Sequence, residues 1–317
     1  MFLQIVLLLT GFILLLKGAD WLVDGAASLA RKYRVPELTI GLTIVAFGTS
    51  APELVVNTFA AARGNPDIVY GNVIGSNNFN LFIILGLAGL ITPLKVHINT
   101  VRREIPLSLL AVIVLYLLTD NLFRAEHQIL SRIDAAVLLA LFAAFLYYVY
   151  LQLKKDKPAN ASPTAIFSDW KIALLILAGL GGLILGGRLV VDQAQDLARA
   201  LGVSEKLIAL TIVAMGTSLP ELATSLVAAI KKNADIAIGN IIGSNIFNIF
   251  LILGISALIR PIPYVPSFNR ELLILGGGTM LLLLAMLTGR RQQLDRWEAA
   301  ILLTVYIVYT VLLIMKA

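Results

Sequence analysis

Six stretches of this sequence are almost wholly apolar and contain no Asp, Glu, Lys or Arg. Each is about as long as the roughly 20-residue helix that crosses the hydrocarbon layer of a membrane. In lipid, only helices and closed barrels satisfy their own backbone hydrogen bonds, and barrel strands would be about ten residues long with strict alternation. The stretches therefore predict membrane-spanning helices: 68–94, 135–153, 172–187, 236–259, 272–289 and 299–315.

The composition agrees with a membrane protein. Hydrophobic residues make up 59% and charged residues 14% of the chain, whereas a soluble domain carries about a quarter charged residues. The net charge of +6 comes from Lys and Arg in the polar breaks, which fits membrane topology and does not indicate nucleic-acid binding. Disulfides and cysteine-ligated metals are excluded because there is no cysteine, and the isolated His97 and His127 predict no transition-metal site.

The chain also repeats itself. Residues 40–86 align without gaps with residues 208–254, and roughly three in five positions are identical. The strongest matches pair LTIVAFGTSAPEL (42–54) with LTIVAMGTSLPEL (210–222), and GNVIGSNNFN (71–80) with GNIIGSNIFN (239–248).

We therefore predict an all-α integral membrane protein of ten transmembrane helices, built as two five-helix repeats within one transmembrane domain. The first repeat is residues 1–153 and the second 169–317, joined by a Lys- and Pro-containing linker, 154–168, that is too short for a regulatory domain. The first apolar segment has no basic n-region and is expected to be a retained helix. The expected helices are 2–30, 37–63, 67–91, 104–119, 134–153, 170–200, 204–230, 235–259, 271–288 and 296–315.

An odd number of helices per repeat makes equivalent helices cross the membrane in opposite directions. The basic residues test this: the break after the first helix has Arg31, Lys32 and Arg34, whereas its counterpart has only Arg199 and Lys206. In successive pairs of equivalent breaks, the break with more Lys and Arg belongs alternately to the first and to the second repeat. The positive-inside rule then predicts a multi-pass plasma-membrane protein with both termini outside and the linker in the cytoplasm. Inverted repeats are typical of alternating-access transporters that bind substrate near the membrane midplane.

Glu53 and Glu221 lie at equivalent positions inside apolar helices. An ionisable group at membrane depth is costly and points to function, and no Lys or Arg in these helix cores could neutralise it. Pro52 and Pro220 precede them. Because proline has no N–H and clashes with the carbonyl four residues back, each helix should break there and free backbone carbonyls near a carboxylate.

Small polar residues at helical spacing share a face with these glutamates. They can pack helices together, but their symmetric placement around a glutamate pair favours coordination. All the ligands offered are oxygens, which suit Na⁺ and Ca²⁺ rather than Zn²⁺. Two carboxylates balance one Ca²⁺, two Na⁺ or two protons, so charge alone does not name the counter-ion. The residues are Ala46, Thr49, Ser50, Glu53 and Asn57; Ala214, Thr217, Ser218, Glu221 and Ser225; Asn72, Ser76 and Asn80; and Asn240, Ser244 and Asn248.

GTSAPE (48–53) and GTSLPE (216–221), each followed by GNxIGSNxFN, resemble the two α-repeats of sodium/calcium exchangers in the calcium/cation antiporter superfamily, specifically the compact prokaryotic type. The resemblance covers the whole chain and implies exchange of about three Na⁺ for one Ca²⁺ by alternating access, with no cofactor. It implies a central Ca²⁺ site at Glu53, Glu221, Thr49 and Thr217, Na⁺ sites at Ala46, Ser50, Ser244, Ala214, Ser218 and Ser76, and a middle position completed by Asn80 and Asn248.

The sequence departs from part of that family at Asn248, where several prokaryotic members and the potassium-dependent branch carry Asp. With Asn in both halves, one negative charge is absent and K⁺ co-transport is not expected. The resemblance also implies that the first and sixth helices slide across the rest of the protein.

Other functions fit less well. A Ca²⁺/H⁺ antiporter is the alternative, since lone glutamates can carry protons, although such proteins usually lack the proline before the acidic residue. A cation channel does not need inverted repeats, and a membrane enzyme would need a nucleophile–base or metal–His arrangement that is not seen. The expected partners are the lipid bilayer and the ions Na⁺ and Ca²⁺, with no nucleic acid; a monomer is compatible with the sequence.

Overall fold

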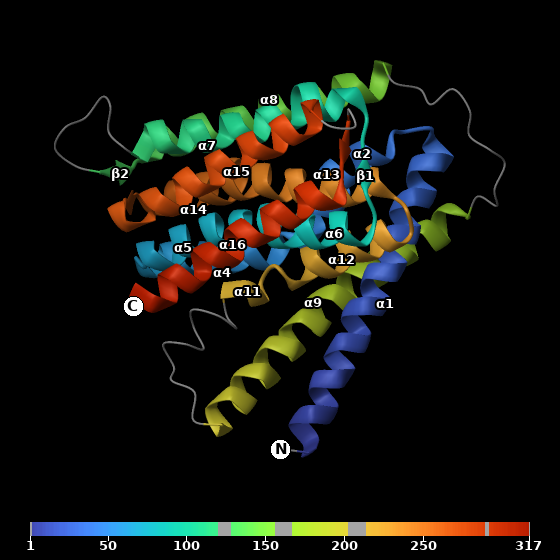
Figure 1. Ribbon diagram of the computed structural model, residues 1–317, viewed down its shortest axis with the longest axis horizontal. Coiled ribbons are helices and arrows are strands. Elements are labelled where there is room, and N and C mark those ends of the chain that lie inside the picture. The colour runs from blue at the N-terminus through green and yellow to red at the C-terminus, as the bar shows by residue number, and fades with distance from the viewer. Residues whose placement is uncertain (1, 120–127, 156–166, 202–213, 289–291, 317) are drawn as a thin grey trace.

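The computed structural model describes residues 2–119, 128–155, 167–201, 214–288 and 292–316. Most of the predicted linker, the beginning of the predicted helix 204–230, and His127 lie outside these residues. The chain is almost entirely helical, as predicted (Figure 1).

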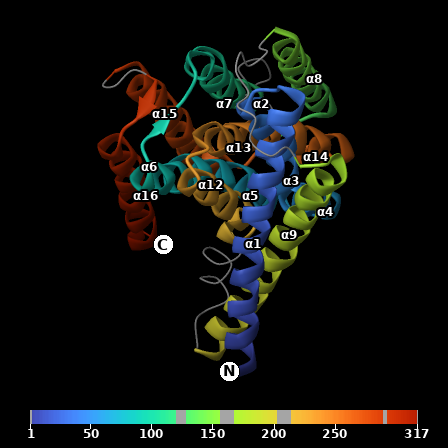
Figure 2. The ribbon, with the colours of Figure 1, turned by 90° about the vertical axis from the view of Figure 1, so that its right-hand side faces the viewer.

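Two 32-residue helices, α1 (Phe2–Tyr33) and α9 (Asp169–Ala200), pack side by side and extend beyond the other helices (Figure 2). Glycines allow their backbones to approach closely. A Cβ at Gly18 would lie 2.7 Å from the backbone nitrogen of Leu183, and one at Gly179 would lie 2.7 Å from that of Leu22. These equivalent helices of the two halves therefore form one closely packed pair.

The second helix of each half is broken where the sequence predicts. In the first half, α2 (Glu37–Ile40), a π-helical turn (Gly41–Val45) and α3 (Ala46–Thr49) are followed after Ser50 by α4 (Ala51–Arg63), with a bend of 48°. In the second half, α11 (Ala214–Gly216) precedes α12 (Leu219–Ile230). Both breaks come directly before the proline–glutamate pair, because the proline cannot donate to the preceding turn.

The third helix of each half lies in the centre of the protein (Figure 1). Each has a π-helical segment at the same place, which periodicity did not predict. Their order is α5 (Pro66–Asn78), η2 (Phe79–Ile84) and α6 (Leu85–Ile91), and α13 (Ala234–Ile246), η5 (Phe247–Ile252) and α14 (Leu253–Ile259).

The remaining helices lie around this centre. In the first half these are η3 (Thr100–Glu104), α7 (Ile105–Thr119) and α8 (Arg132–Lys155). In the second half they are η6 (Pro266–Phe268), α15 (Asn269–Leu287) and α16 (Arg296–Lys316). Exposed leucines and isoleucines, such as Leu177 and Ile133, form an outer apolar surface suited to lipid.

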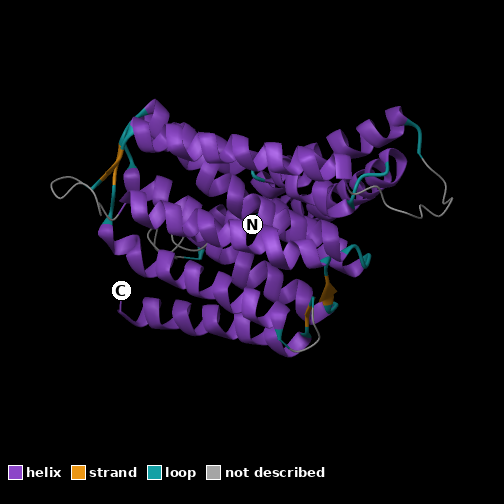
Figure 3. Ribbon diagram, turned by 90° about the horizontal axis from the view of Figure 1, so that it is seen from above, coloured by secondary structure: helices purple, strands orange, loops and turns teal. Residues whose placement is uncertain are grey.

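Two short antiparallel sheets join the halves at opposite ends of the helical body (Figure 3). In one, β1 (Leu94–Lys95) pairs with β4 (Gln293–Leu294); in the other, β2 (Ile129–Leu130) pairs with β3 (Ile262–Pro263). Arg132 donates to the carbonyls of Leu258 and Ile259 at the end of α14, and Arg296 donates to the Ile91 carbonyl at the end of α6. Each half thus stabilises helix ends of the other.

Among the described residues, six helices are long and apolar enough to cross a membrane, or seven when the bent pair Glu37–Thr49 and Ala51–Arg63 counts as one span. The shorter α7 and α12 and the helix α16 occupy the positions of other predicted spans. The arrangement is consistent with the predicted ten helices and shows a multi-pass membrane protein.

Candidate cation-binding site

Glu53 and Glu221 occupy the first turns of α4 and α12, immediately after the breaks. Each side chain is only 1% exposed. The unpaired N–H groups and partial positive charge of a helix N-terminus stabilise a carboxylate there. Among the described residues, neither glutamate forms a salt bridge with Lys or Arg. Their charge is thus left without a basic partner, as the sequence predicted.

The two carboxylates are linked across the halves by serine hydroxyls. Ser218 donates to Glu53 Oε1 at 3.3 Å, and the equivalent Ser50 donates to Glu221 Oε1 at 3.0 Å. Ser244 on α13 also donates to Glu221 Oε1, at 3.4 Å. These contacts hold one oxygen of each carboxylate and bring both breaks to the same point in the protein.

Among the described residues, the buried oxygens without a hydrogen-bond partner include one on each of four predicted ligands: Glu53 Oε2, Glu221 Oε2, Asn80 Oδ1 and Asn248 Oδ1. They come from two pairs of equivalent residues, each at most 1% exposed. Burying a polar oxygen without a partner costs about 1–3 kcal/mol, and more for a charged one. A set of acceptors without donors is the chemistry that a hard cation satisfies. These residues therefore fit a hard cation such as Na⁺ or Ca²⁺.

The threonines at the two breaks also make crossed contacts. The Thr49 hydroxyl donates to Asn240 Oδ1 at 3.0 Å, and the Thr217 hydroxyl donates to Asn72 Oδ1 at 3.1 Å. The Thr49 hydroxyl also lies 3.1 Å from the Val45 carbonyl and 3.3 Å from the Ala46 carbonyl, so its single proton has three possible acceptors. Asn240 and Asn72 thus contact the threonine of the opposite half, which the sequence did not indicate.

Three other predicted site residues, Ser76, Ala46 and Ala214, are connected to the residues of the two breaks through hydrogen bonds or through their position in the chain. Ser76 donates to Asn72 Oδ1 at 3.3 Å, which connects it to Thr217. Ala46 is fully buried, and its carbonyl accepts the Ser50 N–H at 3.0 Å. Ala214 is the first residue of α11, three residues before Thr217.

Sequence reasoning missed Asn77 and Asn245, which are hydrogen-bonded to Asn248 and Asn80. Asn80 Nδ2 donates to Asn245 Oδ1 at 3.1 Å, and Asn248 Nδ2 donates to Asn77 Oδ1 at 2.9 Å. Both belong to the repeated GSNxFN motif, so their equivalence was visible in the sequence. Their contacts were not, because they join one half to the other.

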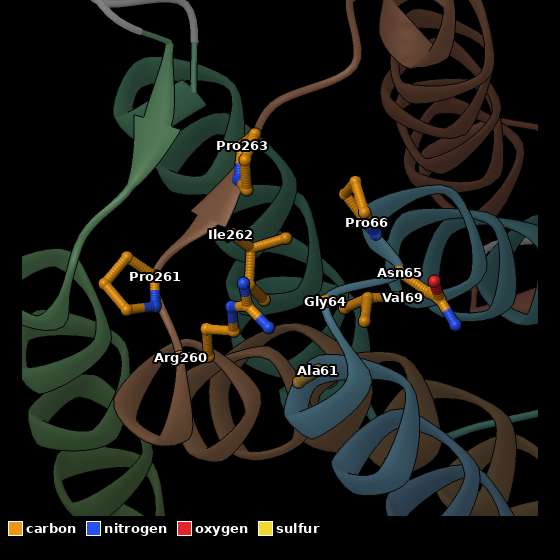
Figure 4. A pocket seen from close by; sticks show the side chains of 9 residues that line it. All are labelled: Ala61, Gly64, Asn65, Pro66, Val69, Arg260, Pro261, Ile262 and Pro263. Carbon is orange, nitrogen blue, oxygen red and sulfur yellow. The ribbon is translucent and has the colours of Figure 1, made fainter.

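A separate surface pocket lies between the α4–α5 turn and the segment after α14, and no predicted site residue lines it (Figure 4). The guanidinium of Arg260 lies against the backbone of Gly64, where a Cβ would meet it at 2.6 Å. Gly64 has a left-handed backbone with φ 74°, which glycine adopts without steric cost. We assign this pocket no part in the cation site.

Comparison with known proteins identifies the family of the chain. The family model described as sodium/calcium exchanger protein matches residues 3–151 and 171–315. The chain is 30% identical to the sodium/calcium exchanger MaX1 of Methanosarcina acetivorans over 97% of both proteins, and 38% identical to the inner membrane protein YrbG of Escherichia coli over 82% of this chain and 81% of that protein.

Among solved structures, the chain is similar to the sodium-calcium exchanger NCX_Mj soaked with Na⁺ and Ca²⁺. The TM-score is 0.83 with 34% sequence identity, and the match covers 98% of each chain. Family match, relatives and structure agree along the full length, and they identify a transporter rather than an enzyme. The chain therefore belongs to the sodium/calcium exchanger family, as a compact prokaryotic-type member of the calcium/cation antiporter superfamily.

Proposed function

We propose that this protein exchanges Na⁺ for Ca²⁺ across the membrane by alternating access, using the cation site between the two breaks. The observation that carries the proposal is the symmetric set of four buried, unpartnered oxygens on Glu53, Glu221, Asn80 and Asn248. Two of them belong to carboxylates without a basic partner, so an uncompensated negative charge is available to cations.

Calcium takes about six to eight oxygen ligands. In our proposal, bidentate binding by Glu53 and Glu221 and one backbone carbonyl each from Thr49 and Thr217 supply six. The flanking positions bind Na⁺, and Asn80 and Asn248 complete the middle. The flanking residues are Ala46, Ser50 and Ser244 on one side, and Ala214, Ser218 and Ser76 on the other.

Exchange follows from charge balance. One Ca²⁺ or two Na⁺ neutralise the two carboxylates, and a third Na⁺ leaves one positive charge. Ca²⁺ together with two or three Na⁺ would leave two or three positive charges in a buried site. An empty site would leave two carboxylates in a low-dielectric interior, which is costly. The protein therefore changes its accessible side most readily when loaded with either ion type alone. This requirement couples the two fluxes.

We further propose that residues 1–153 and 169–317 are inverted repeats, and that α1 and α9 move as a pair against the remaining helices. Their close packing supports a common movement. A ratio of about three Na⁺ per Ca²⁺ would move one net charge per cycle. Each 100 mV would then bias the cycle by about 2.3 kcal/mol. Flux at potentials clamped with K⁺ and valinomycin tests this, since a neutral exchange would not respond.

We propose a plasma-membrane location with both termini outside and the linker 154–168 in the cytoplasm. Because the chain has no cysteine, single cysteines can report topology without background. A cysteine replacing Ser162 should react with an impermeant maleimide only after the cytoplasmic side is opened. One replacing Ser131, beside β2, should react from outside. The opposite pattern would invert the proposed topology.

The binding step can be tested on purified protein. Bound ⁴⁵Ca²⁺ should be displaced steeply by Na⁺ at constant pH, with a Hill coefficient above one, because several Na⁺ replace one Ca²⁺. K⁺ at the same concentration should not displace it. Displacement by acid but not by Na⁺ would instead favour the Ca²⁺/H⁺ antiporter.

A further inference from the structure

We propose that Asn77 and Asn245 are positioning residues that fix the side-chain amides of Asn248 and Asn80, so that both present a carbonyl oxygen to the transported cation. An asparagine amide has an acceptor end and a donor end of nearly equal size. Only the oxygen can bind a cation, so an amide that rotated freely would present the wrong end part of the time. The inference rests on the proposed cation site.

The amides of Asn77 and Asn245 are oriented by two backbone carbonyls, which can only accept hydrogen bonds. Asn245 Nδ2 donates to the Asn77 carbonyl at 3.4 Å, and Asn77 Nδ2 donates to the Asn245 carbonyl at 3.2 Å. Each amide nitrogen is therefore directed at the backbone of the other half. The Oδ1 atom of each residue must then lie on the opposite side of its amide group.

The second pair of amides follows from the first. Asn77 Oδ1 accepts from Asn248 Nδ2 at 2.9 Å, and Asn245 Oδ1 accepts from Asn80 Nδ2 at 3.1 Å. Rotating Asn80 or Asn248 would bring two oxygens together and break a buried bond. The Oδ1 atoms of Asn80 and Asn248 consequently face away from these bonds, and both lack a hydrogen-bond partner. This explains why two buried amides each have a satisfied nitrogen and an unsatisfied oxygen.

A π-helical segment begins two residues after Asn77 in the first half and two residues after Asn245 in the second. The Phe79 N–H bonds to the Gly75 carbonyl four residues back, whereas the Leu85 N–H bonds to the Asn80 carbonyl five residues back. The second half repeats the switch, with the Leu253 N–H bonding to the Asn248 carbonyl. The Asn77 and Asn245 carbonyls, next to the switch, accept side-chain amides.

A double-mutant cycle separates positioning from packing. Asn77→Ala leaves the Asn248 amide free to rotate, and should raise the dissociation constant for ⁴⁵Ca²⁺ by about tenfold, the effect of losing one buried hydrogen bond. In an Asn248→Asp background, either carboxylate oxygen can face the cation, and the second one lies against Asn77 Oδ1. There Asn77→Ala should not weaken binding, because it removes an acceptor that opposes the carboxylate. An equal change in both backgrounds would overturn the inference.

The halves provide matched controls. Asn245→Ala should be rescued by Asn80→Asp and not by Asn248→Asp, and this second cycle remains informative if Asn77→Ala does not fold. Asn78→Ala removes a neighbouring buried asparagine that instead donates to the Glu271 carbonyl. Its effect on binding should be the same with Asn or Asp at position 248.

Thermal unfolding without Ca²⁺ measures the general destabilisation of every variant. The changes in the Ca²⁺ dissociation constant should not correlate with the changes in melting temperature. Wild-type protein that binds no Ca²⁺ would defeat the proposed function itself. Wild-type binding combined with additive cycles would defeat only the positioning inference.

Discussion

The Ser50 hydroxyl donates to Glu221 Oε1 at 3.0 Å, across the boundary between the two halves. Its equivalent, Ser218, makes the same contact with Glu53 at 3.3 Å. A broken helix in each half thus supports the carboxylate of the other. Neither half alone forms the site, which explains why each half carries its own copy of the motif.

Ser50→Ala should weaken Ca²⁺ binding by about tenfold or more, because a hydrogen bond to a charged group contributes roughly 1.5–3 kcal/mol. Ser218→Ala should have a similar effect, since its contact is equivalent. Ser256→Ala is the control, because Ser256 is a fully buried serine whose hydroxyl has no partner. Isothermal calorimetry measures all three. Equal affinities for Ser50→Ala and Ser256→Ala would remove the support for the crossed contacts.

Glu53→Gln and Glu221→Gln should each abolish exchange. The substitution keeps the size of the side chain but removes one of two charges, so the remaining charge no longer balances Ca²⁺. The fold should persist, because no basic residue among those described is left unpaired by the change. Transport in proteoliposomes and thermal unfolding should be measured together. Full transport by either variant would contradict the assignment of the site.

Gly179→Val should disrupt the α1–α9 pair and reduce transport by at least about tenfold, since a Cβ at Gly179 would meet the backbone of Leu22 at 2.7 Å and overpacking costs about 1–3 kcal/mol. Gly181→Val is the matched control two residues along the same helix, because a Cβ there meets nothing within 4 Å. Comparable transport by the two variants would show that close contact between α1 and α9 is not required.

Lys231 follows α12 and binds α1 through Asp20 at 2.6 Å and Asp24 at 2.7 Å. Burial lowers the pKa of the Lys231 ammonium, but bonds to both aspartates outweigh this and raise the pKa above 10.5. The two salt bridges of Lys231 therefore stabilise the folded state below pH 10.5, and this stabilisation is lost as the pH rises through the raised pKa of Lys231. Because all three groups are partly exposed, Lys231→Met should lower the melting temperature by only about 2 °C. Lys232→Met should leave the melting temperature unchanged. Equal shifts for the two variants would show that the effect comes from losing a positive charge and not from the salt bridges of Lys231.

The sequence predicted the parts of the fold that depend on local chemistry. Proline lacks an N–H, so the breaks before Glu53 and Glu221 were expected and are found. Apolar runs of membrane length located the long helices well, although α1 continues to Tyr33, three residues beyond its expected end.

Features that depend on packing between the halves were not predicted. In the π-helical segments at 79–84 and 247–252 the backbone hydrogen bonds span five residues, one more than in an α-helix, and apolar sequences do not reveal that difference. The crossed amides of Asn77 and Asn245, and the sheets that join β1 to β4 and β2 to β3, require the two halves to be placed together.

The most direct measurement is ⁴⁵Ca²⁺ uptake by proteoliposomes loaded with Na⁺, with pH clamped on both sides and with an outward Na⁺ gradient present or absent. The account predicts uptake that requires the Na⁺ gradient, is lost in Glu53→Gln, and does not respond to an imposed pH gradient. Uptake that ignores Na⁺ and follows the pH gradient would contradict sodium/calcium exchange and make the two glutamates proton carriers.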